Sequence, residues 1–299
     1  MNSLLAYLRL SRPANIVTAI ADILAGYAVT LAVLHNGIFS EINYEELILL
    51  NLATIGLYGG GVIMNDVADY ELDKLERPER PLPSGHASRT GAGILGMALL
   101  IGGIIFAYMV SLQSAVIAVI IAVLALFYDF KGKHHKFFGP LNMGLCRGGN
   151  LLLGMSALML ALENYFLLAT IPILYIAAIT MISRGEVVGG NRAAIRYAAF
   201  MYAIVVISIC LIAAYFEGRY FLQALGFIIL FAFLIYRPLI KALQKPEPIN
   251  IRNSVKTGVI SLIVMDAAVA ACFVRWEYAL LVLALFPISI FLAKVFAVT

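Results

Sequence analysis

The chain has 299 residues, of which 63% are hydrophobic and 13% charged, with a formal net charge of +4. Ordinary soluble domains are about 45–50% apolar, so this composition excludes a soluble globular protein and indicates a polytopic membrane protein. We expect the lipid bilayer to be its main partner and expect no nucleic-acid partner. The three cysteines lie in apolar runs without ligand-like spacing, which argues against a disulfide framework or a cysteine metal cluster.

Ten apolar runs are long enough to cross a bilayer core, which takes about 20 residues per helix. They cover residues 14–34, 47–64, 91–111, 114–129, 140–162, 166–183, 197–216, 220–239, 255–274 and 278–297. The fourth run is short and the last two are barely separated, so nine spans plus a re-entrant hairpin is an alternative. No linker divides the chain, and we therefore predict one all-α domain over residues 1–299, a polytopic helical bundle.

Basic residues gather in alternate connections between these runs. Lys and Arg cluster within 9–12, 74–89, 131–136, 184–196 and 237–256, whereas the intervening loops are mainly acidic. Cytoplasmic loops of membrane proteins carry an excess of Lys and Arg. We therefore expect a multi-pass protein of the cell (inner) membrane whose basic connections and both termini are cytoplasmic. The first residues lack the pattern of a cleaved signal peptide.

The most polar segment follows the second run and reads MNDVADYELDKLERPERPLPSG, residues 64–85. Asn65, Asp69 and Asp73 recur every four residues, so on a helix they form one stripe of oxygen ligands with Asp66 beside it. Mg²⁺ takes oxygen ligands and keeps substrate phosphates in its shell, so the stripe suits a Mg²⁺–diphosphate complex. Three nearby basic residues are candidates to hold the remaining phosphate charge: Arg77, Arg80 and Arg89.

The alternative is a solvated loop whose acids and bases merely balance one another. Gly85 and the prolines Pro78, Pro81 and Pro83 favour a loop of defined shape, because proline fixes φ and glycine supplies tight turns.

This segment resembles the first aspartate-rich motif of the UbiA family of intramembrane prenyltransferases, Asn-x3-Asp-x3-Asp followed by Arg-Pro and Arg-Pro-x-x-Ser-Gly. SRPAN at the start of the first run and YDFKGKHHKFFGP after the fourth run agree with the same family. The resemblance covers about residues 8–275, so the run at 278–297 is an addition to the family's nine spans.

The resemblance implies a helical bundle in which two polar motifs face each other over a cavity open to lipid. Family members transfer an isoprenoid from a polyprenyl diphosphate to a small-molecule acceptor, often aromatic, with Mg²⁺. It further implies that Asn65, Asp69 and Asp73 are catalytic metal ligands, and that Lys131 and Lys133 contact diphosphate. Membrane topology alone would also place lysines there.

The second motif departs from the family pattern of Asp-x3-Asp after the sixth span. In MISRGEVVGGNR, Glu186 stands at the first aspartate and Gly190 at the second. A glutamate still ligates a metal, so we predict that Glu186 is catalytic and completes a weaker second metal site. Glycine has no side chain to contribute. The SRGEVVGG form resembles the EboC-like branch of the family.

Among the polar residues inside the predicted spans, Asp22, Arg147, Asn150 and Asp266 are candidates for a role, together with Asn142 beside Arg147. Ionisable groups in a bilayer are costly and usually face a cavity. Arg147 and Asn150 are therefore candidates to bind substrate. The alternative is a buried pair that holds the bundle together, either Arg147 with Asp22 or Arg147 with Asp266.

The leading hypothesis is a Mg²⁺-dependent membrane prenyltransferase with no assigned general base, because an electron-rich acceptor attacks an allylic cation before it loses its proton. The alternative is a non-catalytic isoprenoid- or lipid-binding protein of the same fold, acting in transport or pathway assembly, which the missing carboxylate at Gly190 favours. A cation transporter fits poorly because the acids lie in a connection rather than along a spanning path.

Overall fold

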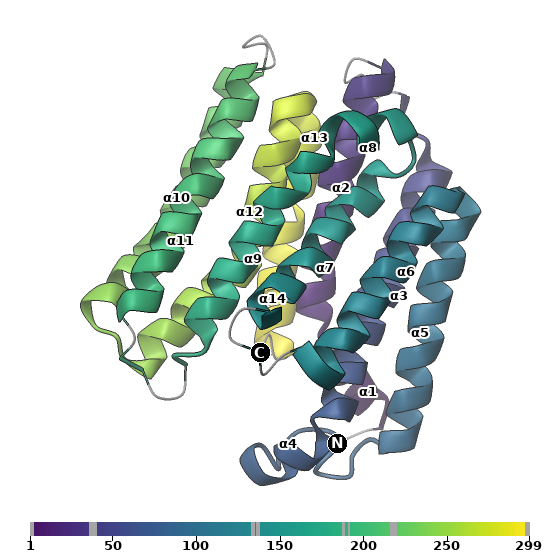
Figure 1. The fold of residues 1–299 in the computed structure, drawn as a ribbon, viewed down its shortest axis with the longest axis vertical. Helices are drawn as coiled ribbons and strands as arrows, with labels where there is room; N and C mark the ends of the chain where they lie inside the picture. The colour runs from purple at the N-terminus through teal and green to yellow at the C-terminus, as the bar shows by residue number, and fades with distance from the viewer. Residues whose placement is uncertain are drawn as a thin grey trace.

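The computed structural model describes residues 3–35, 41–132, 135, 138–186, 189–190, 192–215 and 220–296. Its helices run roughly parallel in one bundle, and both chain ends lie toward the same end of it (Figure 1). The helices are α1 (Ser3–Leu10), α2 (Pro13–His35), α3 (Tyr44–Ala68), α4 (Tyr70–Glu76), α5 (Arg89–Val110), α6 (Leu112–Phe127), η2 (Tyr128–Gly132), α7 (Phe138–Met155), α8 (Met159–Tyr165), η3 (Phe166–Ala169), α9 (Thr170–Ser183), α10 (Arg192–Tyr215), α11 (Phe221–Gln244), α12 (Pro248–Phe273), α13 (Trp276–Leu283) and α14 (Leu285–Val295).

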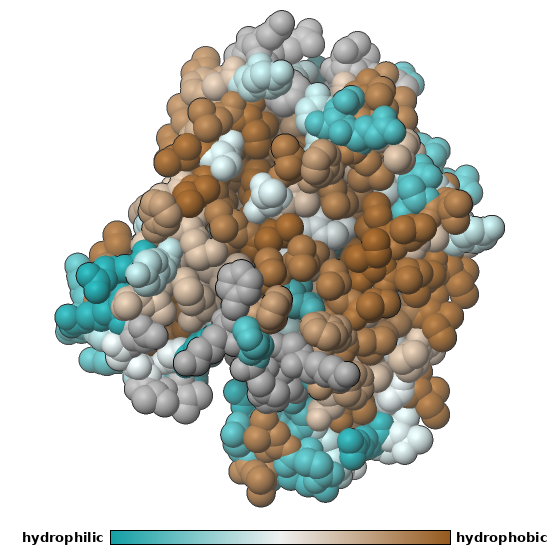
Figure 2. Space-filling view, in the orientation of Figure 1, coloured by the Kyte–Doolittle hydropathy of each residue, from teal (hydrophilic) through white to brown (hydrophobic). Residues whose placement is uncertain are grey.

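Nine helical segments of the described chain are long and apolar enough to cross a membrane. Apolar side chains cover much of the molecular surface in Figure 2, with polar side chains mainly toward the two ends. A soluble protein would bury such side chains, whereas a bilayer accepts them on the outside. The predicted all-α membrane bundle is confirmed, and the described residues form helices and connections without any β-strand.

The predicted span at 140–162 is wrong at its end. α7 ends at Met155, and the chain turns before α8 begins at Met159. Ser156 stabilises this turn, because its hydroxyl donates to the Leu153 carbonyl at 2.6 Å and contacts the Ser114 hydroxyl at 2.7 Å. α8, η3 and α9 then form one apolar segment over Met159–Ser183, so the predicted sixth span begins too late at 166.

α7 is not among the nine apolar segments, although it lies within the bundle. Its polar side chains face inward: Asn142, Arg147 and Asn150 are all buried. Mean hydropathy therefore underestimates the ability of α7 to lie within a membrane, because its polar groups contact neighbouring helices rather than lipid. The ten predicted runs thus correspond to nine apolar segments and this one polar-faced helix in the described chain.

The C-terminal segment α13–α14 runs along α2 in the opposite direction. The Tyr278 hydroxyl donates to the Leu24 carbonyl at 2.8 Å, and the Ser289 hydroxyl donates to the Ala14 carbonyl at 3.0 Å. Ala14 lies near the start of α2 and Leu24 a further ten residues along it. The segment therefore traverses the bundle beside α2, which rules out the alternative of a re-entrant hairpin.

α3 and α5 pack closely through glycines, as membrane helices do where small residues let backbones approach. A methyl group at Gly103 would lie 2.7 Å from the Ala53 carbonyl oxygen, whereas a methyl group at Gly102 would have no atom within 4 Å.

We predict that Gly103→Ala destabilises the protein by about 1–3 kcal/mol, the usual cost of overpacking. The adjacent Gly102→Ala is the matched control. It should be neutral or stabilising by roughly 0.5–1 kcal/mol, because alanine is the better helix former. Thermal unfolding of both variants in the same detergent checks this. Equal melting temperatures for the two variants would contradict the close approach of α3 and α5.

Candidate functional site

The predicted acidic stripe follows a nearly continuous helical path from α3 into α4. Backbone hydrogen bonds run from Asp69 to Asn65 at 2.9 Å, from Asp73 to Asp69 at 2.8 Å and from Arg77 to Asp73 at 2.8 Å. Asp69 lies at the junction of the two helices. The four-residue spacing expected from the sequence is therefore present in the structure.

Asn65 is held by Asp129, a residue that the sequence analysis did not single out. The Asn65 amide nitrogen donates to Asp129 Oδ1 at 2.9 Å. Asp129 is buried in η2, a π-helical turn at the end of α6, and its other oxygen Oδ2 has no hydrogen-bond partner among the described residues. Fixing the amide nitrogen in this way sets the direction of the amide oxygen. In the sequence, the only indication of a role for Asp129 is its position as an acidic residue at the end of an apolar run.

Asp66 and Asp73 are buried and share one arginine. Arg80 Nη1 lies 2.8 Å from Asp73 Oδ2 and 3.5 Å from Asp66 Oδ1. A second arginine, Arg12, donates to Asp66 Oδ1 at 2.8 Å. Burying carboxylates without such partners would be costly. The segment is thus not a solvated loop of balancing charges, at least at these two aspartates.

Arg12 reaches Asp66 from the connection between α1 and α2. Its backbone has φ of +48°, and it is the one non-glycine residue with positive φ among those described. This left-handed conformation costs an ordinary residue about 1–2 kcal/mol. Backbone strain of this kind is concentrated at functional sites, where the surrounding structure holds it in place.

The second polar motif follows α9. Glu186 is half-buried, and its burial raises the pKa of its carboxyl, whereas the guanidiniums of Arg252 and Arg77 oppose that rise. Gly189 and Gly190 have φ of +74° and +85°. The Gly190 amide donates to the Pro246 carbonyl at 2.9 Å, so this turn is attached to the connection before α12.

These glycines bear on whether a side chain could be restored at the second motif. A side chain at Gly189 would meet the Pro246 carbonyl oxygen at 2.8 Å. A side chain at Gly190 has space but would be strained by the left-handed backbone. Restoring an aspartate at Gly190 is therefore opposed by backbone conformation rather than by crowding.

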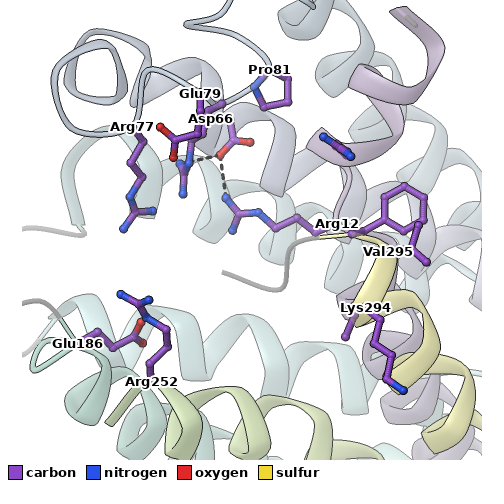
Figure 3. Close-up of a pocket in the computed structure, with 13 residues that line it drawn as sticks. Arg12, Asp66, Arg77, Glu79, Pro81, Glu186, Arg252, Lys294 and Val295 are labelled. Atoms are coloured by element: carbon purple, nitrogen blue, oxygen red, sulfur yellow. Dashed lines mark hydrogen bonds and ion pairs between the residues drawn. The ribbon is translucent and has the colours of Figure 1, made fainter. Parts of the chain in front are cut away.

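Asp66 of the first polar segment and Glu186 of the second border a common cavity of about 600 Å³, whereas Asn65, Asp69 and Asp73 are not among the residues that line it. Arg77, Glu79 and Asp66 extend from one wall, and Glu186 with Arg252 extends from the opposite wall (Figure 3). The lining includes six basic and three acidic side chains, so an anion is favoured. It consists of Arg9, Arg12, Asp66, Arg77, Glu79, Arg80, Pro81, Glu186, Arg252, Ala293, Lys294, Val295 and Phe296.

Two predicted phosphate ligands cannot be placed at this cavity. Lys131 belongs to η2, but its side chain lies outside the described residues, and the whole of Lys133 lies outside them as well. Arg89 pairs with Glu71 at 3.5 Å rather than lining the cavity. Among the described predicted phosphate ligands, Arg77 and Arg80 line it.

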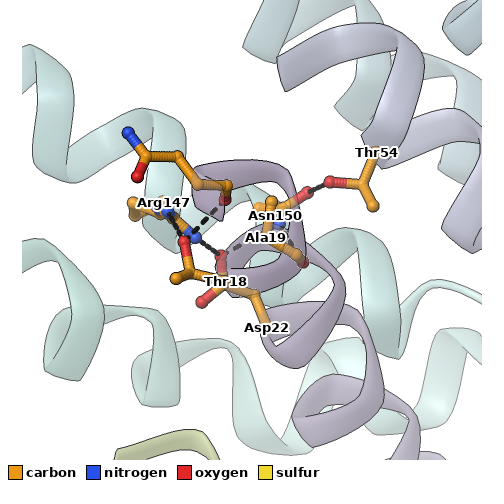
Figure 4. Close-up of polar contacts among 7 residues, drawn as sticks. Thr18, Ala19, Asp22, Thr54, Arg147 and Asn150 are labelled. Atoms are coloured by element: carbon orange, nitrogen blue, oxygen red, sulfur yellow. Dashed lines mark hydrogen bonds and ion pairs between the residues drawn. The ribbon is translucent and has the colours of Figure 1, made fainter. Parts of the chain in front are cut away.

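Arg147 and Asn150 form a separate buried network within the bundle (Figure 4). Arg147 Nη1 donates to Asp22 Oδ2 at 2.6 Å, and the Asn150 amide donates to the same oxygen at 2.9 Å. The Thr54 hydroxyl donates to Asn150 at 2.6 Å. This is the Arg147–Asp22 pair that the sequence analysis gave as the alternative to substrate binding. Neither residue lines the cavity described above.

The described residues contain no ready-made group of three His, Cys, Asp or Glu side chains that would hold a metal ion. The predicted set of Asn65, Asp69, Asp73 and Glu186 is therefore not assembled as one centre. Asp73 of this set is paired with Arg80, which also contacts Asp66. The oxygen donors of Asn65, Asp69 and Asp73 are of the type that a hard cation takes. Glu186 lies on the opposite wall of the cavity from Asp66.

Comparisons with known proteins point to one family over most of the chain. A model of the UbiA prenyltransferase family matches residues 23–248. The digeranylgeranylglyceryl phosphate synthase of Saccharolobus solfataricus is 33% identical over 191 residues, covering 63% of this chain and 63% of the relative. That of Methanoculleus marisnigri is 30% identical, covering 64% of this chain and 66% of the relative. The aligned part thus spans slightly less than two thirds of either relative.

Solved structures agree in fold. A structure of digeranylgeranylglyceryl phosphate synthase gives a TM-score of 0.67 at 23% identity and covers 92% of this chain and all of its own. A UbiA homologue from Archaeoglobus fulgidus, bound to GPP and Mg²⁺, gives a TM-score of 0.64 at 16% identity and covers 88% of this chain and 99% of its own. Together with the family model, which matches well over half of the sequence, these likenesses show that the chain belongs to the UbiA prenyltransferase family.

Proposed function

We propose that this protein is an integral membrane prenyltransferase that transfers an isoprenoid from an allylic diphosphate to a small-molecule acceptor. The observation that supports it most directly is the cavity beside the first motif, in which six basic side chains outnumber the acidic side chains of Asp66, Glu79 and Glu186. The names of the relatives support transfer to a glyceryl phosphate lipid as the acceptor class. Membership of the EboC-like branch stays a prediction.

Asn65, Asp69 and Asp73 are the residues we propose to hold Mg²⁺ with the diphosphate. The fit rests on oxygen donors spaced along one helical path and on the orphaned oxygen of Asp129 beside Asn65. When bound, the metal stabilises the charge that develops on the departing diphosphate. Arg77 and Arg80 add charge-assisted hydrogen bonds to the phosphate oxygens.

The rest of the reaction requires orientation and exclusion of water. The carbon–oxygen bond to the diphosphate breaks with its electron pair on oxygen, and the acceptor then bonds to the allylic carbon and loses a proton. Exclusion of water from the allylic cation would have to come from the apolar helices of the bundle, because the cavity itself is lined mainly by charged side chains. Arg147 and Asn150 are already engaged with Asp22, so we propose that they support the bundle around the reaction space.

The alternative proposal is a non-catalytic isoprenoid-binding protein of the same fold. Two observations support this alternative. Gly190 contributes no carboxylate, and Glu186 is separated from the first motif. Both proposals require diphosphate binding at the first motif, whereas only the enzyme requires prenyl transfer.

For orientation, we propose that the loops carrying Asp69, Lys133, Glu186 and Lys245 share the cytoplasmic face with both termini. The cavity supports a common face, because Asp66 and Glu186 border it together. Single cysteines placed next to Asp69 and Glu186 should react with a membrane-impermeant thiol reagent from the cytoplasmic side only. Labelling of the two positions from opposite sides would refute a shared site.

We predict that Asp69→Asn and Asp73→Asn each abolish Mg²⁺-dependent binding of a non-hydrolysable allylic diphosphate. Asp69→Asn should stay folded, whereas Asp73→Asn also loses the ion pair with Arg80, so its melting temperature is measured alongside. Losing one ligand of a charged metal–diphosphate complex should weaken binding by about 3–5 kcal/mol, by analogy with breaking a buried ion pair. Calorimetric titration measures this, with Glu71→Gln as the control because Glu71 is exposed on the same helix. Unchanged affinity for the diphosphate in both aspartate variants would show that the first motif does not bind it.

We also predict that Glu186→Ala lowers turnover at least tenfold while the melting temperature changes little, because the side chain lies in the cavity wall rather than in the packed core. Glu163→Ala, exposed in α8 at the other end of the bundle, is the control. Prenyl transfer is followed by mass spectrometry of the product. If Glu186→Ala leaves both ligand binding and the cellular phenotype intact, and no donor supports transfer, the binding-protein alternative is correct.

A further inference from the structure

The described residues of the second polar motif, 181–186 and 189–190, do not fit a second metal ion. Gly190 offers no ligand, and its left-handed backbone disfavours replacement by a residue that would. Gly189 has no room for a side chain. Glu186 is left as a lone carboxylate on its wall, and the described residues provide no group of three candidate ligands. A single carboxylate is a weak site for a divalent cation, which requires several oxygen ligands.

The same glycine turn brings a positively charged side chain, that of Arg252, to this wall of the cavity. The hydrogen bond from the Gly190 amide to the Pro246 carbonyl attaches the second motif to the connection that precedes α12. α12 begins at Pro248, and Arg252 follows about one helical turn later. Figure 3 shows the Arg252 guanidinium beside the Glu186 carboxylate, with both side chains at the cavity.

Arg252 and Arg77 differ from the other two arginines near the first motif, Arg12 and Arg80, in what they contact. Arg12 and Arg80 are ion-paired with the aspartates of the first motif. Arg77 and Arg252 take part in none of the ion pairs of 4 Å or less between described side chains. They extend toward each other from the two walls, with the cavity between them. Two such guanidiniums are suited to grip one phosphate group, because each presents a planar set of N–H donors.

We propose that Arg252 binds the diphosphate of the prenyl donor in place of a second metal ion, so that this chain holds its substrate between one metal-binding motif and the guanidiniums of Arg77 and Arg252. The Glu186 carboxylate lies beside Arg252 on the same wall of the cavity. This inference rests on the proposed function, since it assigns the partner of the same diphosphate. It also accounts for the loss of the aspartate at Gly190, because the fixed positive charge of Arg252 makes a second divalent cation unnecessary.

The test measures binding rather than turnover, with the full chain in detergent. Affinity for inorganic pyrophosphate is titrated in EDTA on wild type, Arg252→Gln, Arg252→Lys and Lys256→Gln. Lys256 is the matched control, because it is an exposed basic residue one turn further along α12 that does not line the cavity. In a second measurement, the Mn²⁺ bound in the presence of a non-hydrolysable allylic diphosphate is counted by electron paramagnetic resonance.

We expect Arg252→Gln to weaken metal-free pyrophosphate binding about 10- to 100-fold, the range for losing a hydrogen-bonded charge. Arg252→Lys should recover part of that loss, and Lys256→Gln should bind like wild type. Wild type should bind a single Mn²⁺ ion with the allylic diphosphate. Two bound Mn²⁺ ions, or equal pyrophosphate affinity for Arg252→Gln and wild type, would overturn the assignment of Arg252 while leaving the prenyltransferase proposal intact. A wild type that binds no diphosphate under either condition would overturn both.

Discussion

The bridge that Arg80 makes between Asp66 and Asp73 holds the candidate site together. Two carboxylates buried so close to each other would repel, and the interaction between like charges is strong where water is scarce. A guanidinium that contacts both removes this repulsion and attaches the loop after α4 to the end of α3. Arg12 adds the connection between α1 and α2 to the same cluster. Four chain segments are thereby fixed around one end of the bundle.

A second cluster of buried charges lies inside the bundle rather than at the cavity. Arg147 and Asn150 both donate to Asp22 Oδ2 among α2 and α7, away from the cavity, while Asp22 Oδ1 has no hydrogen-bond partner among the described residues. The guanidinium also donates to the Thr18 hydroxyl and lies over the Tyr58 ring. So many partners leave the group little capacity to bind substrate, whereas removing any one of them would leave a polar atom unpaired in an apolar interior. The cluster specifies how these helices meet.

Much of the fold follows from local sequence, and much of the site does not. Apolar runs of adequate length predicted most of the helices, and the four-residue spacing of Asn65, Asp69 and Asp73 predicted their common path. Arg12, Asp129 and Arg252 belong to the site through contacts between segments far apart in the chain, which no periodicity encodes. The end of α7 was missed because the chain is equally apolar on both sides of Ser156, and only tertiary hydrogen bonds place the turn there.

The helix that runs back along α2 has a further effect on the molecule. It returns the end of the chain to the side from which the chain started, so Ala293–Phe296 become part of the wall around the reaction space. A bundle that stopped after α12 would leave that stretch of wall open. The terminus is also the part of a sequence that evolution lengthens or trims most freely. The volume offered to a substrate can therefore change at the tail of this protein, independently of the charged residues that bind phosphate.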